Sequence, residues 1–439
     1  MTRAAGNPLV RGGLTIVAGV LTGNALGVLR VGLIAYLLGT HSRADSLAVA
    51  MGPIDTLNSV LTNSMVFAFV PLLTGCSGAE RIAIFRKVGR GFLWVFSFIT
   101  LGLLIAAPWL MRALAPGLIS PYFENAVELL RILSVSTFFA GSAAVYWALL
   151  FTERRFVLAA FYQAALNVCT IAAALCLWKT LGVYAFAVGY TAGAGVQLAT
   201  AYFATRRQLQ VTQLLQMTAA PATLRFRDIL AKPAFFMVYA AGLALNVTFT
   251  RAYATHAGSG MAAALDYCMR GVGVPLALLV TPISNSLLPE IARLRNLSRV
   301  REALRLIDRT VAFTALAVVA GCAFAILFRR PAIAIFFQRG SFTADSTHLV
   351  AAVFLGMAPS LVGWTLIEII SRALFALNRP WPPVIAAAIP LLLNVTLTLR
   401  LHSHRPELIG LGSSAGLFAG FAALFAMAHL GRRRWLKQE

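Results

Sequence analysis

Acidic residues are scarce in this chain. Asp and Glu together number 15 among 439 residues, the six His are scattered, and no HExxH or paired-carboxylate motif occurs. Enzymes that work at a membrane, such as glycosyltransferases and polymer ligases, need acids, bases or metal ligands, usually on sizeable loops. The shortage of these groups argues against an enzyme.

Cysteine is also sparse. The five cysteines lie in or beside apolar segments, without the CxxC or Cys/His spacing that is typical of a metal or redox site. We therefore expect them to be small apolar packing residues.

Charged residues of both signs make up only 12% of the chain, whereas 59% is hydrophobic and the mean hydropathy is +0.80. A soluble domain cannot bury this many apolar residues, because polar residues must cover its outside. A membrane span needs about 20 mostly apolar residues, and runs of that kind recur along the whole chain. We predict an all-α polytopic membrane protein with about twelve transmembrane helices.

The net charge of +22 is unevenly distributed. Most of the Lys and Arg fall in the loops on the side of both termini, which the positive-inside rule assigns to the cytoplasm. The basic residues therefore set topology and attract anionic membrane lipids. Because no aromatic residues are interleaved with them, we expect no nucleic acid among the partners.

Two polar stretches organise the chain. Residues 204–232 form a predicted cytoplasmic linker between an N-lobe at 1–203 and a C-lobe at 233–439, each with six helices. Residues 289–310 carry apolar side chains every three or four positions with arginines between them. This pattern predicts an amphipathic helix on the cytoplasmic membrane surface, whose ordinary role is anchoring.

The two predicted lobes contain similar segments. Residues 148–167 resemble 373–394, and residues 67–75 resemble 284–294, at about the same offset along the chain. An even number of spans separates each pair, so the lobes share one orientation and are related about the membrane normal. Two six-helix lobes around a central cavity are typical of transporters.

One arginine lies deep in the first predicted span. Arg30 precedes Thr40 by ten residues, about 15 Å along a helix, which places it near mid-membrane. An arginine facing lipid at that depth costs at least about 3 kcal/mol. No acid lies within four residues on the same helix, so Arg30 requires either Asp55 or an anionic ligand.

Other polar residues accompany Arg30. Asp266 and Arg270 lie one helical turn apart, where they can neutralise each other, and Arg251 lies nearer the periplasmic end, where it can snorkel. Structural ion pairs and a substrate site both remain open. Guanidinium groups match phosphate oxygens, so a phospholipid or a lipid-linked pyrophosphate suits a cavity with excess positive charge. The candidate substrate-binding residues are Arg30, Arg270, Asn24, Asp55, Asn58, Asp266 and Arg251.

Several segments resemble a known family. The sequence "GNALGVLRVGLIAYLLGTHSRADSLAVAMGPIDTLNSVLTNSMVFAFVPLL" at 23–73 is similar to the opening of the MurJ/MviN lipid II flippases, a family of the multidrug/oligosaccharidyl-lipid/polysaccharide exporter superfamily. The segments "YCMRGVGVPLALLVTPISNSLLPEIARL" at 267–294 and "FFQRGSFTADST" at 336–347 match further family segments in order. The resemblance implies a MurJ-like fold around a V-shaped cavity with alternating access. It also implies a bacterial inner-membrane location and undecaprenyl-pyrophosphate carrying the peptidoglycan precursor as substrate.

The resemblance assigns roles to some of these residues. Arg30 and Arg270 fall where the family has cavity arginines important for transport. The family usually has basic residues at the positions of Asn24, Asn58 and Ser59, and an acid at that of Met269.

Energy coupling is a further implication. Some family members bind sodium through carboxylates on the seventh and eleventh spans, where this chain offers only Asn246, Thr250 and Asn394 as candidate metal ligands. We expect no cofactor, and coupling to the membrane potential or to a monovalent cation.

Several functions stay open beside lipid II flipping. The departures at Asn24, Asn58 and Ser59 are compatible with a flippase for another lipid-linked oligosaccharide, such as an exopolysaccharide or O-antigen unit. They are also compatible with a scaffold that no longer transports. A cation-coupled drug antiporter of the same superfamily would favour a cavity dominated by acids, unlike the one predicted here. We expect the chain to function as a monomer.

Overall fold

The computed structural model describes residues 8–74, 78–153, 162–215, 226–270, 293–401 and 408–436, together with 287, 290, 291 and 405. Within these residues the regular structure is helical and no strand occurs. The helices in chain order are α1 (Pro8–Leu38), α2 (Ser42–Thr74), α3 (Gly78–Leu114), α4 (Tyr122–Thr152), α6 (Tyr162–Leu181), α7 (Tyr184–Leu215), α8 (Phe226–Ala257), α10 (Val300–Leu327), α11 (Arg329–Phe337), α12 (Ala344–Ala376), α13 (Trp381–Leu401) and α14 (Leu411–Leu436). A further helical stretch covers residues 261–270.

Nine helices in the described part of the chain are long and apolar enough to cross a membrane. α3 illustrates the reason. Residues 91–111 contain no Asp, Glu, Lys or Arg, and at 1.5 Å per residue they extend about 32 Å, close to the thickness of the hydrocarbon core. The predicted all-α polytopic architecture is confirmed.

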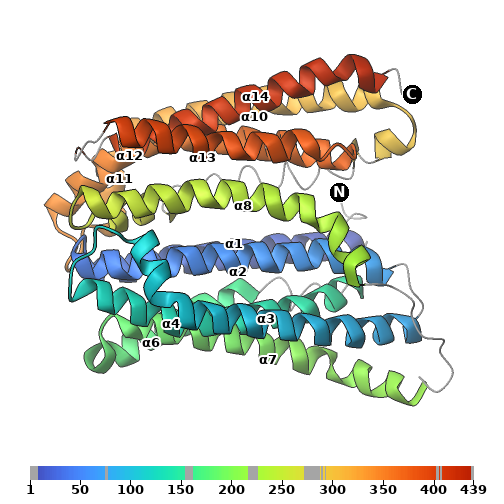
Figure 1. Cartoon of the computed structure of the whole chain (residues 1–439), viewed down its shortest axis with the longest axis horizontal. Helices are drawn as coiled ribbons and strands as arrows, with labels where there is room; N and C mark the ends of the chain where they lie inside the picture. The colour runs from blue at the N-terminus through green and yellow to red at the C-terminus, as the bar shows by residue number, and fades with distance from the viewer. Residues whose placement is uncertain are drawn as a thin grey trace. The chain divides into compact units, whose positions relative to one another are not determined.

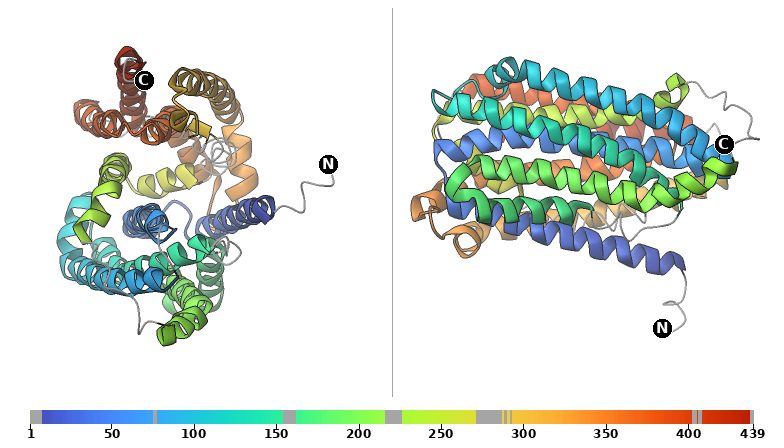
Figure 2. Two further views of the ribbon diagram at one scale, coloured as in Figure 1. Left: turned by 90° about the vertical axis from the view of Figure 1, so that its right-hand side faces the viewer. Right: turned by 90° about the horizontal axis from the view of Figure 1, so that it is seen from below.

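The chain divides into two compact units. Unit 1 contains residues 1–33, 46–113 and 119–237, and unit 2 contains residues 34–45, 114–118 and 238–439. Within unit 1, α7 packs against both α4 and α6, and α6 and α7 run alongside each other in Figure 2. Within unit 2, α14 packs against α12 and α13, and α12 also contacts α10 and α11 (Figure 1).

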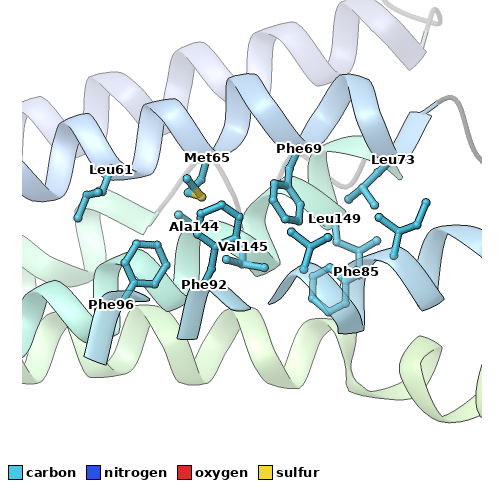
Figure 3. Close-up of a cluster of buried hydrophobic side chains, with 13 residues drawn as sticks. Leu61, Met65, Phe69, Leu73, Phe85, Phe92, Phe96, Ala144, Val145 and Leu149 are labelled. Atoms are coloured by element: carbon cyan, nitrogen blue, oxygen red, sulfur yellow. The ribbon is translucent and has the colours of Figure 1, made fainter. Parts of the chain in front are cut away.

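The core of unit 1 is built where α2, α3 and α4 meet. Phe69 of α2 and Phe92 of α3 both belong to this core cluster (Figure 3). Their ring centroids are 5.4 Å apart. Gly141 allows α4 to approach α3 closely, because a Cβ at this position would lie 2.7 Å from the ring of Phe96. Lipid is as apolar as these side chains, so close packing and dispersion hold such a cluster together, with little contribution from water exclusion.

The α1–α2 turn belongs to unit 2, although the sequence suggested a simple division into residues 1–203 and 233–439. The Tyr267 hydroxyl donates a hydrogen bond to the Gly39 carbonyl at 2.7 Å. The Asp45 carboxylate accepts hydrogen bonds from the backbone N–H groups of Gly260 at 2.5 Å and Ala263 at 2.8 Å. These contacts join the turn to the start of the helical stretch 261–270.

Both polar stretches of the sequence differ in helix boundaries from what the sequence predicts. α7 continues to Leu215 and α8 begins at Phe226, so helices cover both ends of the 204–232 segment; residues 216–225 lie outside the described part. In the 289–310 segment the helix breaks near Ser298, which has a φ of 55°, and α10 begins at Val300. A positive φ interrupts a helix. The expected single surface helix is therefore divided, and its second half is the start of a candidate span, α10.

Candidate substrate site with buried arginines

Arg30 is held inside unit 1 by residues from two other helices. Its side chain on α1 is 6% exposed. Its Nη2 lies 3.5 Å from Asp55 Oδ2 on α2. Its guanidinium carbon also lies 5.7 Å from the ring centroid of Tyr190 on α7, within the range of a cation–π contact. Of the two partners that the sequence left open for Arg30, the structure contains Asp55, which neutralises the charge.

Two of the predicted asparagines lie on the same two helices. Asn58 is buried on α2, and its side-chain amide donates a hydrogen bond to Ser136 Oγ on α4 at 3.0 Å. The Tyr190 side chain lies close enough to Asp55 and Asn58 to interact with both. Asn24 is half-buried on α1. The structure thus brings Tyr190 together with Arg30, Asp55 and Asn58, although no local sequence pattern indicates this residue.

Unit 2 contains a second cluster, in which two arginines share one acid. Arg251 Nη2 donates to Asp266 Oδ1 at 2.8 Å, and Arg270 Nε donates to Asp266 Oδ2 at 2.7 Å. The predicted Asp266–Arg270 pair is therefore present. Arg251 does not snorkel; it is 5% exposed and pairs with the same carboxylate.

The charges of this cluster do not cancel. Two guanidinium groups face one carboxylate, so these three side chains together carry one net positive charge. Nε and Nη1 of Arg251 are buried without a hydrogen-bond partner among the described residues. The Arg270 side chain is 23% exposed, so it is the member most accessible from outside the cluster. This arrangement offers donors and positive charge to an anion, and guanidinium groups suit phosphate oxygens.

The three candidate metal ligands are brought together in unit 2. Asn394 Nδ2 on α13 donates to Asn246 Oδ1 at 2.9 Å and to Thr250 Oγ1 at 2.8 Å, both on α8. Asn394 Oδ1 accepts a hydrogen bond from Thr398 at 2.9 Å. Hard cations require a shell of oxygen atoms, and here an amide N–H group points at those oxygens. As arranged, these residues do not fit a bound cation. Within the described residues, no group of three or more His, Cys, Asp or Glu could hold a metal.

A further ion pair lies on α12 of unit 2. Arg372 Nε donates to Glu368 Oε1 at 2.7 Å. The Tyr239 hydroxyl of α8 donates to the other carboxylate oxygen at 2.9 Å. Spacing along the helix predicts the first contact. The second joins residues far apart in sequence and has no local sequence signal.

A family model described as "Lipid II flippase MurJ" matches residues 34–439 of the chain. The chain belongs to the lipid II flippase MurJ family. A protein of Rhizobium meliloti (strain 1021) named "Probable lipid II flippase MurJ" is 27% identical, over 97% of this chain and 82% of that protein. "Lipid II flippase MurJ" of Burkholderia cenocepacia is also 27% identical, over 86% of this chain and 75% of that protein.

Solved structures show the same fold. A structure titled "Lipid II flippase MurJ, inward closed conformation" has a TM-score of 0.81 at 20% identity, and covers 95% of this chain and 87% of that one. An inward-facing multidrug resistance MATE transporter of the MOP superfamily has a TM-score of 0.73 at 19% identity, over 93% and 96% of the two chains. Membership of the MurJ family makes the chain a multi-pass membrane transporter and not an enzyme.

Proposed function

We propose that this chain flips lipid II, the undecaprenyl-pyrophosphate-linked precursor of peptidoglycan, from the cytoplasmic to the periplasmic leaflet of a bacterial inner membrane. The observation that carries the proposal is the MurJ family match over residues 34–439. Curated relatives that align with most of the chain carry lipid II flippase names. Alternating access is the mechanism that the family resemblance implies.

The buried arginines support an anionic substrate. The cluster of Arg251, Asp266 and Arg270 carries one net positive charge in a part of the chain with apolar helices. A charged side chain within a membrane is energetically unfavourable unless it pairs with an opposite charge or serves a function. We propose that Arg270 contacts the pyrophosphate and that Arg251 holds Asp266 in position beside it.

The cluster of Arg30 and Asp55 has a second proposed role. With Asp55 at 3.5 Å and Tyr190 over its face, Arg30 is neutralised in this conformation. We propose that the substrate pyrophosphate competes with Asp55 for Arg30 during transport, and that the neighbouring Asn24 and Asn58 offer polar contacts. A 3.5 Å separation exceeds the length of a good charge-assisted hydrogen bond, so less energy is lost when this pair opens.

We also propose that both termini are cytoplasmic, that the chain works as a monomer, and that the membrane potential drives transport. The excess of Lys and Arg in alternate loops supports the orientation. The amide hydrogen bonds of Asn394 favour the membrane potential over a bound cation. Reporter fusions at the C-terminus test the orientation, and a periplasmic signal contradicts it.

Complementation tests the proposed function. Cells depleted of their own lipid II flippase should grow when they express this chain, because lipid II again reaches the periplasmic enzymes that polymerise it. The matched control is an unrelated drug antiporter of the superfamily expressed to the same level. Continued lysis, with the protein present in the membrane, would exclude lipid II. Rescue of export of another lipid-linked glycan in the same cells would assign that substrate instead.

A further inference from the structure

A pocket that plays no part in the arginine clusters lies between α3 and α4 of unit 1. Its volume is about 360 Å³. Arg86 and Arg90 line it from α3, and Ser142 and Tyr146 line it from α4. Two basic side chains at an i,i+4 spacing therefore lie beside a hydroxyl and an aromatic ring.

The sequence of α3 fixes the depth of this pocket in the membrane. Residues 91–111, which carry no charge, match the thickness of the hydrocarbon core. Arg90 and Arg112 therefore lie at its two boundaries. The pocket reaches one turn to either side of Arg90, so it lies at the level of the lipid headgroups.

An apolar stripe on α3 continues from Arg90 toward the middle of the membrane. Trp94, Phe98, Leu101 and Ile105 are each more than half exposed. They follow Arg90 at intervals of three and four residues, so they share its face of the helix. In a membrane protein such a face contacts acyl chains. A basic residue at the headgroup level and an apolar stripe below it match the two ends of one phospholipid.

Ser142 provides an independent indication of a ligand. Its side chain is fully buried and lines the pocket, yet its hydroxyl has no hydrogen-bond partner among the described residues. A buried hydroxyl without a partner is unfavourable. An oxygen of a bound headgroup within the pocket would satisfy it.

We propose that this pocket binds the headgroup of an anionic phospholipid, with its phosphate at Arg86 and Arg90 and its acyl chains along the stripe that begins at Trp94. The two guanidinium groups select a net negative headgroup over a zwitterionic one. Charge-assisted contacts to phosphate are the strong hydrogen bonds of proteins, and basic residues at a membrane surface attract anionic lipid. The site would hold a lipid of the bilayer, distinct from the transported substrate.

Native mass spectrometry of the purified full chain tests the proposal, with phosphatidylglycerol and phosphatidylcholine titrated separately. Arg86→Gln and Arg90→Gln should each weaken the first phosphatidylglycerol-binding event about tenfold, the loss of one charge-assisted contact. Binding of phosphatidylcholine should not change. Lys87→Gln and Arg112→Gln are matched controls, because they remove the same charge from the same helix outside the pocket, and they should leave the affinity unchanged.

A second variant fills the pocket and keeps both arginines. A Cβ at Gly89 would meet only Val145 Cγ1, at 3.5 Å, so Gly89→Leu fits the helix while its side chain occupies the pocket. This variant should also lose the specific phosphatidylglycerol site. Inorganic phosphate at millimolar concentration should not displace the lipid, because it lacks acyl chains.

Three results would overturn the proposal. Unchanged affinity in Gly89→Leu or in the Arg86→Gln, Arg90→Gln double variant would place the lipid elsewhere. An equal loss in Lys87→Gln would indicate diffuse surface charge. Competition by inorganic phosphate as effective as that by phosphatidylglycerol would make this a site for soluble anions. Arg90 is exposed, so its substitution leaves folding intact and the test remains valid if Gly89→Leu does not fold.

Discussion

Asp266 supplies the one carboxylate that two arginines share, so its removal is the most informative change in unit 2. Asp266→Asn keeps the shape of the side chain and removes its charge. Arg251 is 5% exposed and hydrogen-bonds to Asp266 at 2.8 Å. After the substitution its charge stays buried without a counter-ion. The variant should therefore be much less stable than the parent chain.

The magnitude follows from the contacts that are lost. Breaking a buried ion pair by removal of one partner costs about 3–5 kcal/mol. Arg270 is 23% exposed and can recover hydration, so most of this cost arises at Arg251. The surface pair of Glu290 and Arg293 is a matched control with a similar 2.7 Å contact. Glu290 is 42% exposed, and Glu290→Gln should change the stability little, because solvent screens an exposed ion pair.

Thermal melting of the purified variants in one detergent measures the difference. Asp266→Asn should melt well below Glu290→Gln, and Arg270→Gln should lie between them. The double variant Arg251→Met, Asp266→Leu should recover much of the loss, because neither charge then remains buried alone. If Asp266→Asn and Glu290→Gln melt at the same temperature, Asp266 does not hold Arg251 as described.

Two further predictions concern unit 2. Burial raises the pKa of Asp45 to about 6, against backbone hydrogen bonds that lower it. The folded protein therefore holds the Asp45 proton more tightly than the unfolded chain, and about 3 kcal/mol of stability is lost as the pH rises from 4 through 6. Asp45→Asn should reduce the dependence of the melting temperature on pH between 4 and 6. An unchanged pH dependence would contradict the role of Asp45. Asn394→Ala removes the amide donor to Asn246 Oδ1 and Thr250 Oγ1 and should cost about 2–4 kcal/mol in chemical denaturation. The parent chain should melt at the same temperature in sodium and in choline; sodium-dependent melting would refute the amide arrangement.

The helical architecture is predictable from sequence because each span must supply about 20 apolar residues in one run. The pair of Asp266 and Arg270 is predictable for a similar reason, since residues four apart on a helix face each other. The contact of Asp266 with Arg251 is not, because a turn separates the two helices and its geometry decides whether they meet. Asn246 and Asn394 likewise meet only through the packing of α8 against α13. Contacts across helices depend on tertiary structure, which no local pattern encodes.

The ends of the helices also could not be predicted from the sequence. The apolar positions of residues 289–310 suit one amphipathic helix. The helix is nevertheless interrupted near Ser298, and the long helix α10 begins at Val300. An amphipathic first turn and a membrane span can follow each other without a polar interruption. Hydrophobic periodicity identifies a helix more reliably than it identifies its end.

The periplasmic accessibility of lipid II in cells depleted of their own flippase tests the central claim most directly. The parent chain should restore accessibility, whereas Arg30→Ala and Arg270→Ala should each abolish it while the protein remains in the membrane. Lysine at either position should restore only part of the activity, because it keeps the charge and loses the guanidinium fork. Accessibility at the parent level in the Arg30→Ala, Arg270→Ala double variant would contradict recognition of the pyrophosphate by these arginines.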